Sequence, residues 1–363
     1  MGTGAPVLTR YARLLLVPVL GAAAPHGVFA APPPHESWTA TVRYENDMLL
    51  PGGTDRYYTN GIQLSAVSPD LEWFSDLPVF REGTMLGRAA AWVAEVLPFT
   101  ADRTRQRNVS LTLGQLMFTP QDTQRTDLIV DDRPYAGWLY GGIAFHIKTY
   151  RELDTFQFQG GFTGPWSLAE EAQNLVHDIR GIRRARGWDN QIDTEFAFAF
   201  IYDRKYRLIP RIELGRRWGA DLIVHGGGAL GTAFSHASAG FEARFGWNVP
   251  TDFGTAVIRP AGETSMPADS GDPRYDPTGS GFSFHISAGI TGRAVLNDIF
   301  LDGNTFEDSH NVDKETFVGD FVLGANLIYG RWKLSYSHVL RTKEFVGQDD
   351  SQKFGSVTLS YTF

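Results

Sequence analysis

The sequence has no cysteine among its 363 residues, so disulfide bonds, thiolate metal sites and cysteine nucleophiles are excluded. It also has no excess of positive charge: 33 lysine and arginine residues face 41 aspartate and glutamate residues, which gives a formal net charge of −8. Proteins that bind nucleic acids normally carry a basic surface. We therefore expect no nucleic-acid partner.

Long hydrophobic runs are also missing. After the N-terminus, no stretch reaches the roughly 18 uninterrupted apolar residues of a membrane-spanning helix, so we expect no such helix. The N-terminal run, 14–24, is short and is interrupted by Pro18. Two arginines precede it and small residues occupy the −3 and −1 positions before Ala31, as in a secretory signal peptide. We predict a signal peptide over 1–30 and one exported domain over 31–363.

The sequence is instead rich in alternating patterns. At the end of the chain, apolar side chains occupy every second position, with small polar side chains between them. These are Val357, Leu359, Tyr361 and Phe363, alternating with Ser356, Thr358, Ser360 and Thr362. A period of two indicates a β-strand with two different faces. The same pattern recurs at 196–202, 282–291 and 332–340.

The composition of the two faces favours a membrane barrel over a soluble sandwich, whose strands also alternate. The apolar face is rich in aromatic residues, and Tyr or Trp lies near strand ends, as in the girdles of outer-membrane barrels. The other face suits a hydrated lumen, and the last strand ends on Phe363. We predict an all-β fold, a transmembrane antiparallel β-barrel of about 12 strands. The predicted strands span 37–46, 57–67, 107–117, 138–148, 153–163, 190–208, 219–232, 235–247, 281–293, 316–329, 331–341 and 352–363.

An even number of strands returns both chain ends to one side of the membrane, which we assign to the periplasm. The connections that then lie outside the cell are 47–56, 118–137 and 164–189. Two long connections, 68–106 and 249–280, fall on the periplasmic side, against the rule that periplasmic turns are short. Within the first of them, residues 84–98 are predicted to form a short amphipathic helix.

Polar residues gather where the first predicted strand ends and the second begins. Asp47 continues the polar face of the first strand, Thr59 belongs to the polar face of the second, and Asn46 is adjacent. Pairing the two strands brings Asp47 and Thr59 together near the outer rim, facing the same way. Asn, Asp and Gly also occur in turns because they tolerate turn geometry, so this pattern by itself fits either a plain turn or a site.

The connection 164–189 contains a predicted helix. Ser167 and Glu170 have the spacing of a capping box. Apolar residues follow at helical spacing, namely Leu168, Ala172, Leu175, Val176 and Ile179. Gln173 and His177 are four residues apart, so they stack on one face beside this apolar stripe, which we expect to lie against the barrel rim. A helical histidine is often only solvated, but histidine is also the commonest general base at neutral pH.

Together these stretches resemble the outer-membrane lipid A 3′-O-deacylase (LpxR-type) family. The resemblance rests on "ENDMLLPGGTDRYYTNGIQLS", "LGQLMFTPQD", "DDRPYAGWLY", "AEEAQNLVHDIRG" with "GWDNQ", and the closing strand, and it covers nearly the whole mature chain. It implies a twelve-stranded, calcium-dependent outer-membrane barrel that hydrolyses the ester holding the 3′-acyloxyacyl group of lipid A. It also implies an active site toward the outer leaflet, between the barrel wall and a helix of an external loop.

By position, the functional residues of the family fall on Asn46, Asp47, Thr59, Arg125, Gln173 and His177. The resemblance implies that His177 takes a proton from water and that Gln173, one turn earlier, fixes its ring or the water. Asp47 would bind Ca²⁺, which prefers carboxylate and carbonyl oxygens. Asn46 and Thr59 would donate hydrogen bonds to the oxyanion or the sugar oxygens. Arg125, where the family has a lysine, would pair with a phosphate of lipid A.

Two alternative functions remain open for a barrel with this sequence. A phospholipase-type esterase of the outer membrane would use the same chemistry on glycerophospholipids. A barrel that only conducts or adheres would need none of the six residues. The expected partners are lipid A or lipopolysaccharide as substrate and the surrounding outer-membrane lipids. The oligomeric state is left open by the sequence, with a monomer as the expectation.

The barrel assignment predicts a heat-modifiable membrane protein, because a closed sheet satisfies all of its backbone hydrogen bonds within lipid and resists detergent until it is heated. Unheated samples should migrate differently from boiled ones in a denaturing gel. Recovery of the mature chain as a soluble periplasmic protein would contradict the assignment.

Overall fold

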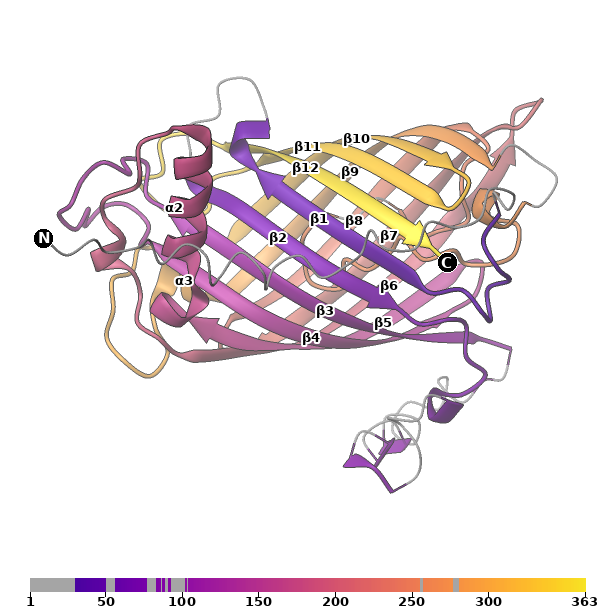
Figure 1. The fold of residues 1–363 in the computed structure, drawn as a ribbon, viewed down its shortest axis with the longest axis horizontal. Coiled ribbons are helices and arrows are strands. Elements are labelled where there is room, and N and C mark those ends of the chain that lie inside the picture. The colour runs from indigo at the N-terminus through magenta and orange to yellow at the C-terminus, as the bar shows by residue number, and fades with distance from the viewer. Residues whose placement is uncertain are drawn as a thin grey trace, which may run out of the picture.

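The computed structural model describes residues 30–49, 56–76, 83–85, 87–88, 91–92, 102, 104–254, 257–276 and 281–363. Within this part of the chain, twelve antiparallel strands close into one barrel in which each strand pairs with its sequence neighbours and β12 pairs with β1. Figure 1 shows the tilted strands, with helix α2 across one end and the C-terminus at the other. Among the described residues, no helix is long and apolar enough to cross a membrane.

The elements, in chain order, are β1 (Thr39–Asn46), β2 (Tyr57–Val67), β3 (Gln106–Thr119), β4 (Ala136–Lys148), β5 (Glu152–Thr163), α2 (Ala169–Arg180), β6 (Phe196–Glu213), β7 (Trp218–Gly231), β8 (Phe234–Trp247), β9 (Phe282–Asp298), α3 (Ile299–Asp302), β10 (Phe317–Tyr329), β11 (Trp332–Arg341) and β12 (Gln352–Thr362). The strand prediction is therefore confirmed for all twelve strands. The largest difference is in β6, which begins six residues later than predicted, at Phe196, and continues to Glu213. Its pairing with β7 is irregular on either side of Ile209. Pro210 lies at the second irregularity and cannot donate a ladder hydrogen bond.

The two chain ends meet at one end of the barrel, where Trp38 and Phe363 exchange backbone hydrogen bonds of 2.8 and 2.9 Å. We call this the periplasmic end and the other the external end. Near the periplasmic end, Trp332 packs on Tyr361 with ring centroids 4.4 Å apart, as part of an outward-facing aromatic group. On the inner face, the hydroxyls of Thr41 and Ser360 are hydrogen-bonded at 3.0 Å. The alternation in the sequence thus separates a lipid-facing surface from a polar lumen.

The long connection between β8 and β9 occupies the lumen. Its residue Glu263 pairs with Arg43 on the inner face of β1, and the backbone N–H of Ala261 donates to Gln157 Oε1 on β5 at 2.8 Å. Strands β1 and β5 belong to well-separated parts of the wall. We call the described residues 249–254 and 257–276 the plug. The connection starts and returns at the periplasmic end, as predicted. Its unexpected length is explained because it enters the lumen and contacts separate parts of the wall.

A buried ionic network anchors the base of the plug. The carboxylate of Asp252 accepts hydrogen bonds from Arg244 at 2.6 Å, Lys333 at 2.5 Å and Arg274 at 3.2 Å. Burial by itself raises the pKa of Asp252, but Lys333, Arg244 and Arg274 hold that pKa well below its ordinary value. Because the folded-state pKa is depressed, the stabilisation is fully present above the unfolded pKa and is lost as the pH falls toward the folded one.

The other long periplasmic connection packs against the end of the barrel where its first residues follow β2. Leu71 pairs with Arg107 in an isolated bridge, and Phe74 packs against Val109 and Ile147. Most of the helix predicted over 84–98 lies outside the described residues, although residues 85, 87–88 and 91–92 are helical. The predicted signal peptide also lies outside them, except for Ala30.

Neutralising Asp252 should loosen the plug, because Asp252→Asn leaves three buried cations with one carboxylate fewer. Removing one partner of a buried ion pair costs about 3–5 kcal/mol. We expect the temperature at which the barrel loses its unheated gel mobility to fall clearly. The matched control is Asp308→Asn, at an exposed position in an external loop. Equal melting of the two variants would show that the plug is not held by this network.

Candidate functional site

Helix α2 crosses the outer wall of the barrel near its external end (Figure 1). Its first residue, Ala169, faces Gly137 of β4, and Arg180 at its other end contacts the Met48 sulfur, just after β1, at 3.5 Å. The helix has 12 residues, or about 18 Å at about 1.5 Å per residue. Four adjacent strands span about 14 Å. The middle turns of α2 therefore lie over β3 and β2, between the two anchored ends.

The start of α2 is pressed closely onto the strands. A side chain at Gly137 would run into the Ser167 hydroxyl and the Ala169 methyl group, so glycine is what allows this approach. Gln115 Nε2 donates to the Ser167 carbonyl at 2.7 Å. Met117, which faces outward from β3, is buried in a cluster with Ala169. These contacts fix the helix against β3 and β4 before the site residues are reached.

The predicted capping box is not formed. The residue before the helix is Leu168, in a left-handed conformation with φ of 56°, and it caps no N–H with its side chain. The Ser167 hydroxyl instead donates to the Gly164 carbonyl at 2.6 Å. A short 3-10 helix over Gly164–Ser167 precedes α2 and takes the serine out of the capping position.

The predicted docking of the apolar stripe on the barrel rim holds only for Ala172, which packs against the buried cluster below the helix, whereas Leu168 is exposed. The buried face of α2 consists of Ala169, Gln173 and His177. Leu175 and Ile179 are 54% and 76% exposed on the other side. Because lipid surrounds the wall, apolar side chains can face outward there. The exposed face of α2 also carries charged residues, namely Glu171, Asp178 and Arg180. This orientation of α2 encloses two of the predicted site residues, Gln173 and His177.

His177 is held in one orientation and one tautomer. Its Nδ1 lies 2.7 Å from the carbonyl oxygen of Arg183, and a carbonyl can only accept, so Nδ1 carries a proton. In the neutral ring, Nε2 is then the unprotonated nitrogen, the form that a general base requires. Gly181, with φ of 67°, ends the helix, and the N–H of Ile182 donates to the His177 carbonyl at 2.9 Å. This reversal of the chain brings Arg183 back to the ring.

Gln173 is oriented by Trp188, a residue for which no separate role was predicted. Trp188 Nε1 donates to Gln173 Oε1 at 2.7 Å, and Trp188 packs on Tyr135 with ring centroids 4.9 Å apart. Both aromatic residues belong to the cluster under the start of α2. The conspicuous "GWDNQ" stretch was the only signal for Trp188 in the sequence.

Thr59 lies at a bulge that changes its direction. In the pairing of β2 with β3, Tyr58 faces Phe118 and Asn60 faces Met117, which leaves Thr59 as the extra residue. Strict alternation puts Thr59 on the lumen side, but its hydroxyl lies 2.6 Å from that of Thr119, which alternates with Phe118 to the outside. We expected Thr59 to face the lumen with the other polar residues of β1 and β2. This prediction is wrong, because the bulge turns Thr59 to the outer side of the wall, where α2 lies.

Asn46 and Asp47 lie opposite the start of β2, as expected. Asn46 pairs with Asn60 across the hairpin, and its Oδ1 accepts the Met48 N–H at 2.7 Å. Asp47 begins a 3-10 helix, Asp47–Leu49, and its Oδ2 accepts the Arg56 N–H at 3.3 Å. Both residues are buried. The structure thus places Asn46, Asp47 and Thr59 at adjoining strand ends, next to Met48, which Arg180 of α2 contacts.

Arg125 is the predicted residue that remains exposed. Its loop nevertheless docks on the segment after α2: the N–H of Arg186 donates to the Thr123 carbonyl at 2.8 Å, and Asn190 Nδ2 donates to the Thr126 carbonyl at 2.8 Å. The structure brings the loop of Arg125, rather than its guanidinium group, to the site.

The site contains oxygen atoms of the kinds that act as Ca²⁺ ligands. These are the buried carboxylate of Asp47, the amide oxygen of Asn46 and the hydroxyl of Thr59. Among the described residues, no group of three or more histidine and acidic side chains is arranged to hold a metal ion. A cation bound here would accordingly rely on one carboxylate and on neutral oxygens, which calcium sites commonly include.

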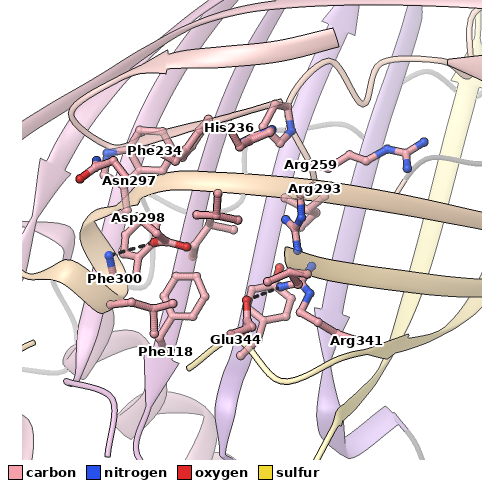
Figure 2. A pocket seen from close by; sticks show the side chains of 18 of the residues that line it. Phe118, Phe234, His236, Arg259, Arg293, Asn297, Asp298, Phe300, Arg341 and Glu344 are labelled. Atoms are coloured by element: carbon pink, nitrogen blue, oxygen red, sulfur yellow. Dashed lines mark hydrogen bonds and ion pairs between the residues drawn. The ribbon is translucent and has the colours of Figure 1, made fainter. Parts of the chain in front are cut away.

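A separate cavity lies inside the barrel. Phe118, Phe234 and Phe300 line one part of it, and three arginines line another (Figure 2). Of these arginines, Arg341 is paired with Glu344 at 3.3 Å. In the described part of the chain, the cavity lining includes none of the six predicted site residues. The cavity and the candidate site are on opposite sides of the wall.

The fold and the site define an outer-membrane β-barrel with a helix on its outer wall. The buried face of this helix carries an oriented histidine and an oriented glutamine. The family model described as "Outer membrane protein LpxR" matches residues 13–363, so the chain belongs to this family. No match was found among curated proteins.

The solved structure of an LpxR protein supports the fold. The structure of LpxR from Salmonella typhimurium matches with a TM-score of 0.69 at 16% identity, covering 90% of this chain and 100% of the other. The β domain of the Bordetella autotransporter BrkA matches with a TM-score of 0.40 at 8% identity, covering 90% of this chain and 98% of the other.

Proposed function

We propose that the protein is a calcium-dependent lipid A 3′-O-deacylase that hydrolyses the ester of the 3′-acyloxyacyl group in the outer leaflet. The observation that supports this most is the tautomer of His177 on the buried face of α2: its Nδ1–H donates to the Arg183 carbonyl, so Nε2 is the unprotonated nitrogen. A site outside the barrel wall is reached from the membrane rather than through the lumen. Family membership supports lipid A as the substrate.

The reaction is an ester hydrolysis in which His177 moves one proton. Nε2 takes a proton from water while the water oxygen bonds to the ester carbonyl carbon. The bond from that carbon to the 3′-oxygen of the sugar then breaks, and the proton passes from Nε2 to this oxygen. The products are the free acyloxyacyl acid and a 3′-hydroxyl. Gln173, fixed by Trp188, keeps the water or the ring in place.

The negative charge that develops on the carbonyl oxygen needs donors at the strand ends. The side chains of Asn46 and Thr59 supply hydrogen bonds there. Asp47, with these neutral oxygens, would hold Ca²⁺, which when bound polarises the carbonyl. Because Asp47 is buried, its charge favours a cation more strongly than an exposed carboxylate would.

The substrate would approach from the side of the barrel. The exposed apolar residues of α2, including Leu175 and Ile179, are compatible with acyl chains of the outer leaflet. Arg125, exposed on the neighbouring loop, would pair with a phosphate of lipid A. The plug inside the lumen speaks against a passive pore, which needs an open channel.

His177→Ala should lower the deacylation rate by about 10²–10⁴-fold, the usual contribution of a general base. The measurement is mass spectrometry of lipid A after incubation with the purified, heat-modifiable barrel. His310→Ala is the control, since His310 is an external-loop histidine that contacts the Asp132 carbonyl. Near-normal deacylation by His177→Ala would remove the base from the mechanism.

Chelation should abolish deacylation, and added Ca²⁺ should restore it, if Asp47 holds the cation. Asp47→Asn should be inactive at any Ca²⁺ concentration, because the amide lacks the charge that retains the ion. Asp189→Asn, at an exposed position after α2, serves as the matched control. Full activity of the normal protein in excess chelator would exclude the metal, and glycerophospholipid cleavage without lipid A cleavage would favour the esterase alternative.

A further inference from the structure

One buried carboxylate joins three segments inside the lumen, directly behind the candidate site. Glu45 is fully buried. Its Oε2 accepts the hydroxyl of Tyr58 on β2 at 2.8 Å, and its Oε1 accepts the N–H of Ile258 in the plug at 2.6 Å. Both donors are neutral groups. Glu45 itself belongs to β1, so the carboxylate connects β1, β2 and the plug.

Tyr58 reaches Glu45 because its ring lies along the inner wall. It packs on Phe354 and Phe118 with ring centroids 4.9 and 5.4 Å apart. A side chain at Gly61 would run into the Tyr58 hydroxyl, so the ring occupies the space above this glycine. The glycine of "YYTNG" therefore has a packing role: it makes room for the tyrosine three residues earlier.

The inward position of Tyr58 is linked to the outward position of Thr59. Tyr58 still pairs with Phe118 in register, and the register shift comes immediately after it. Thr59 is the residue that the shift expels to the outer side, where it meets Thr119. On the other strand, Glu45 directly precedes Asn46 and Asp47. Each strand that carries site residues is thus fastened to the lumen one residue before them.

The plug has its own attachments around Ile258, so it can act as a fixed support. The ion pair of Arg43 with Glu263 and the hydrogen bond from the N–H of Ala261 to Gln157 lie within five residues of Ile258 along the chain. The Ile258 side chain also approaches Gly61 closely. The plug therefore supports the strand pair from behind, at the level of the site.

We infer that Glu45, Tyr58 and the plug at Ile258 form a lumenal clamp whose function is to position Asn46, Asp47 and Thr59 on the outer side of the wall. Glu45 and Tyr58 are positioning residues, since they face away from the substrate. A connection that enters from the periplasmic end thereby controls the geometry of a site that faces the outer leaflet. The inference rests on the proposed deacylase function for its activity readout.

Tyr58→Phe tests the clamp with the smallest change, because it removes one hydroxyl and keeps the ring. We expect kcat for lipid A deacylation to fall about tenfold, the rate equivalent of one hydrogen bond, with KM little changed. Tyr140→Phe is the matched control: Tyr140 is also a buried lumenal tyrosine, but its hydroxyl accepts from Gln63. It should stay within about twofold of the normal kcat.

The carboxylate is tested by a graded pair of variants. Glu45→Gln keeps one acceptor oxygen and should retain more kcat than Glu45→Ala, which removes both. Tyr58→Phe combined with Glu45→Ala should be no worse than Glu45→Ala alone, because the two changes break the same hydrogen bond. Heat modifiability confirms that each variant is a folded barrel. Normal kcat in folded Tyr58→Phe and Glu45→Ala would overturn the clamp.

A second readout does not depend on activity. Amide hydrogen exchange over 46–49 and 57–61 should quicken in Tyr58→Phe and not in Tyr140→Phe. If the normal protein releases no acyl chain from lipid A, the proposed function fails, while faster exchange in Tyr58→Phe would still support the clamp. If the normal protein is active and neither kcat nor exchange changes, the clamp fails and the proposed function stands.

Discussion

The structure depends on one constraint, the need to satisfy every backbone hydrogen bond of a sheet that lipid surrounds. Closure of twelve strands meets this need and leaves only two places for side chains, the lipid side and the lumen. Polar chemistry on the lipid side then requires a cover. Helix α2 is that cover, because its buried face carries Gln173 and His177 while Leu175 and Ile179 are exposed on the other side. The enclosed site follows from the same rule that shapes the strands.

The lumen obeys the rule in a different way. Its wall carries many charged residues, which need partners once water is excluded. The plug supplies them, through Asp252 with Lys333 and Arg244, and through Glu263 with Arg43. The length of the connection between β8 and β9 is therefore a property of the interior. The backbone of the same plug also contacts Glu45, so the interior and the outer site share one set of strands.

Helix α2 illustrates how a correct element can be given the wrong orientation. Its existence and the spacing of Gln173 and His177 were read from the sequence correctly. The expectation that its apolar stripe contacts the barrel came from soluble proteins, in which apolar faces pack inward. Here the medium around the wall is lipid, so Leu175 and Ile179 point away from it. The roles of Arg125 and of a calcium ion stay predictions.

The barrel could be predicted from local sequence, because a period of two that recurs along the chain records the two environments of a strand. The same reasoning located the residues at the strand ends and on the helix. The fold was needed to show that Thr59 faces outward, since a bulge depends on the pairing of β2 with β3. It likewise decided that the plug fills the lumen and that Trp188 and Arg183 orient the site residues. Such contacts join residues from different segments, and local patterns carry no record of which segments will meet.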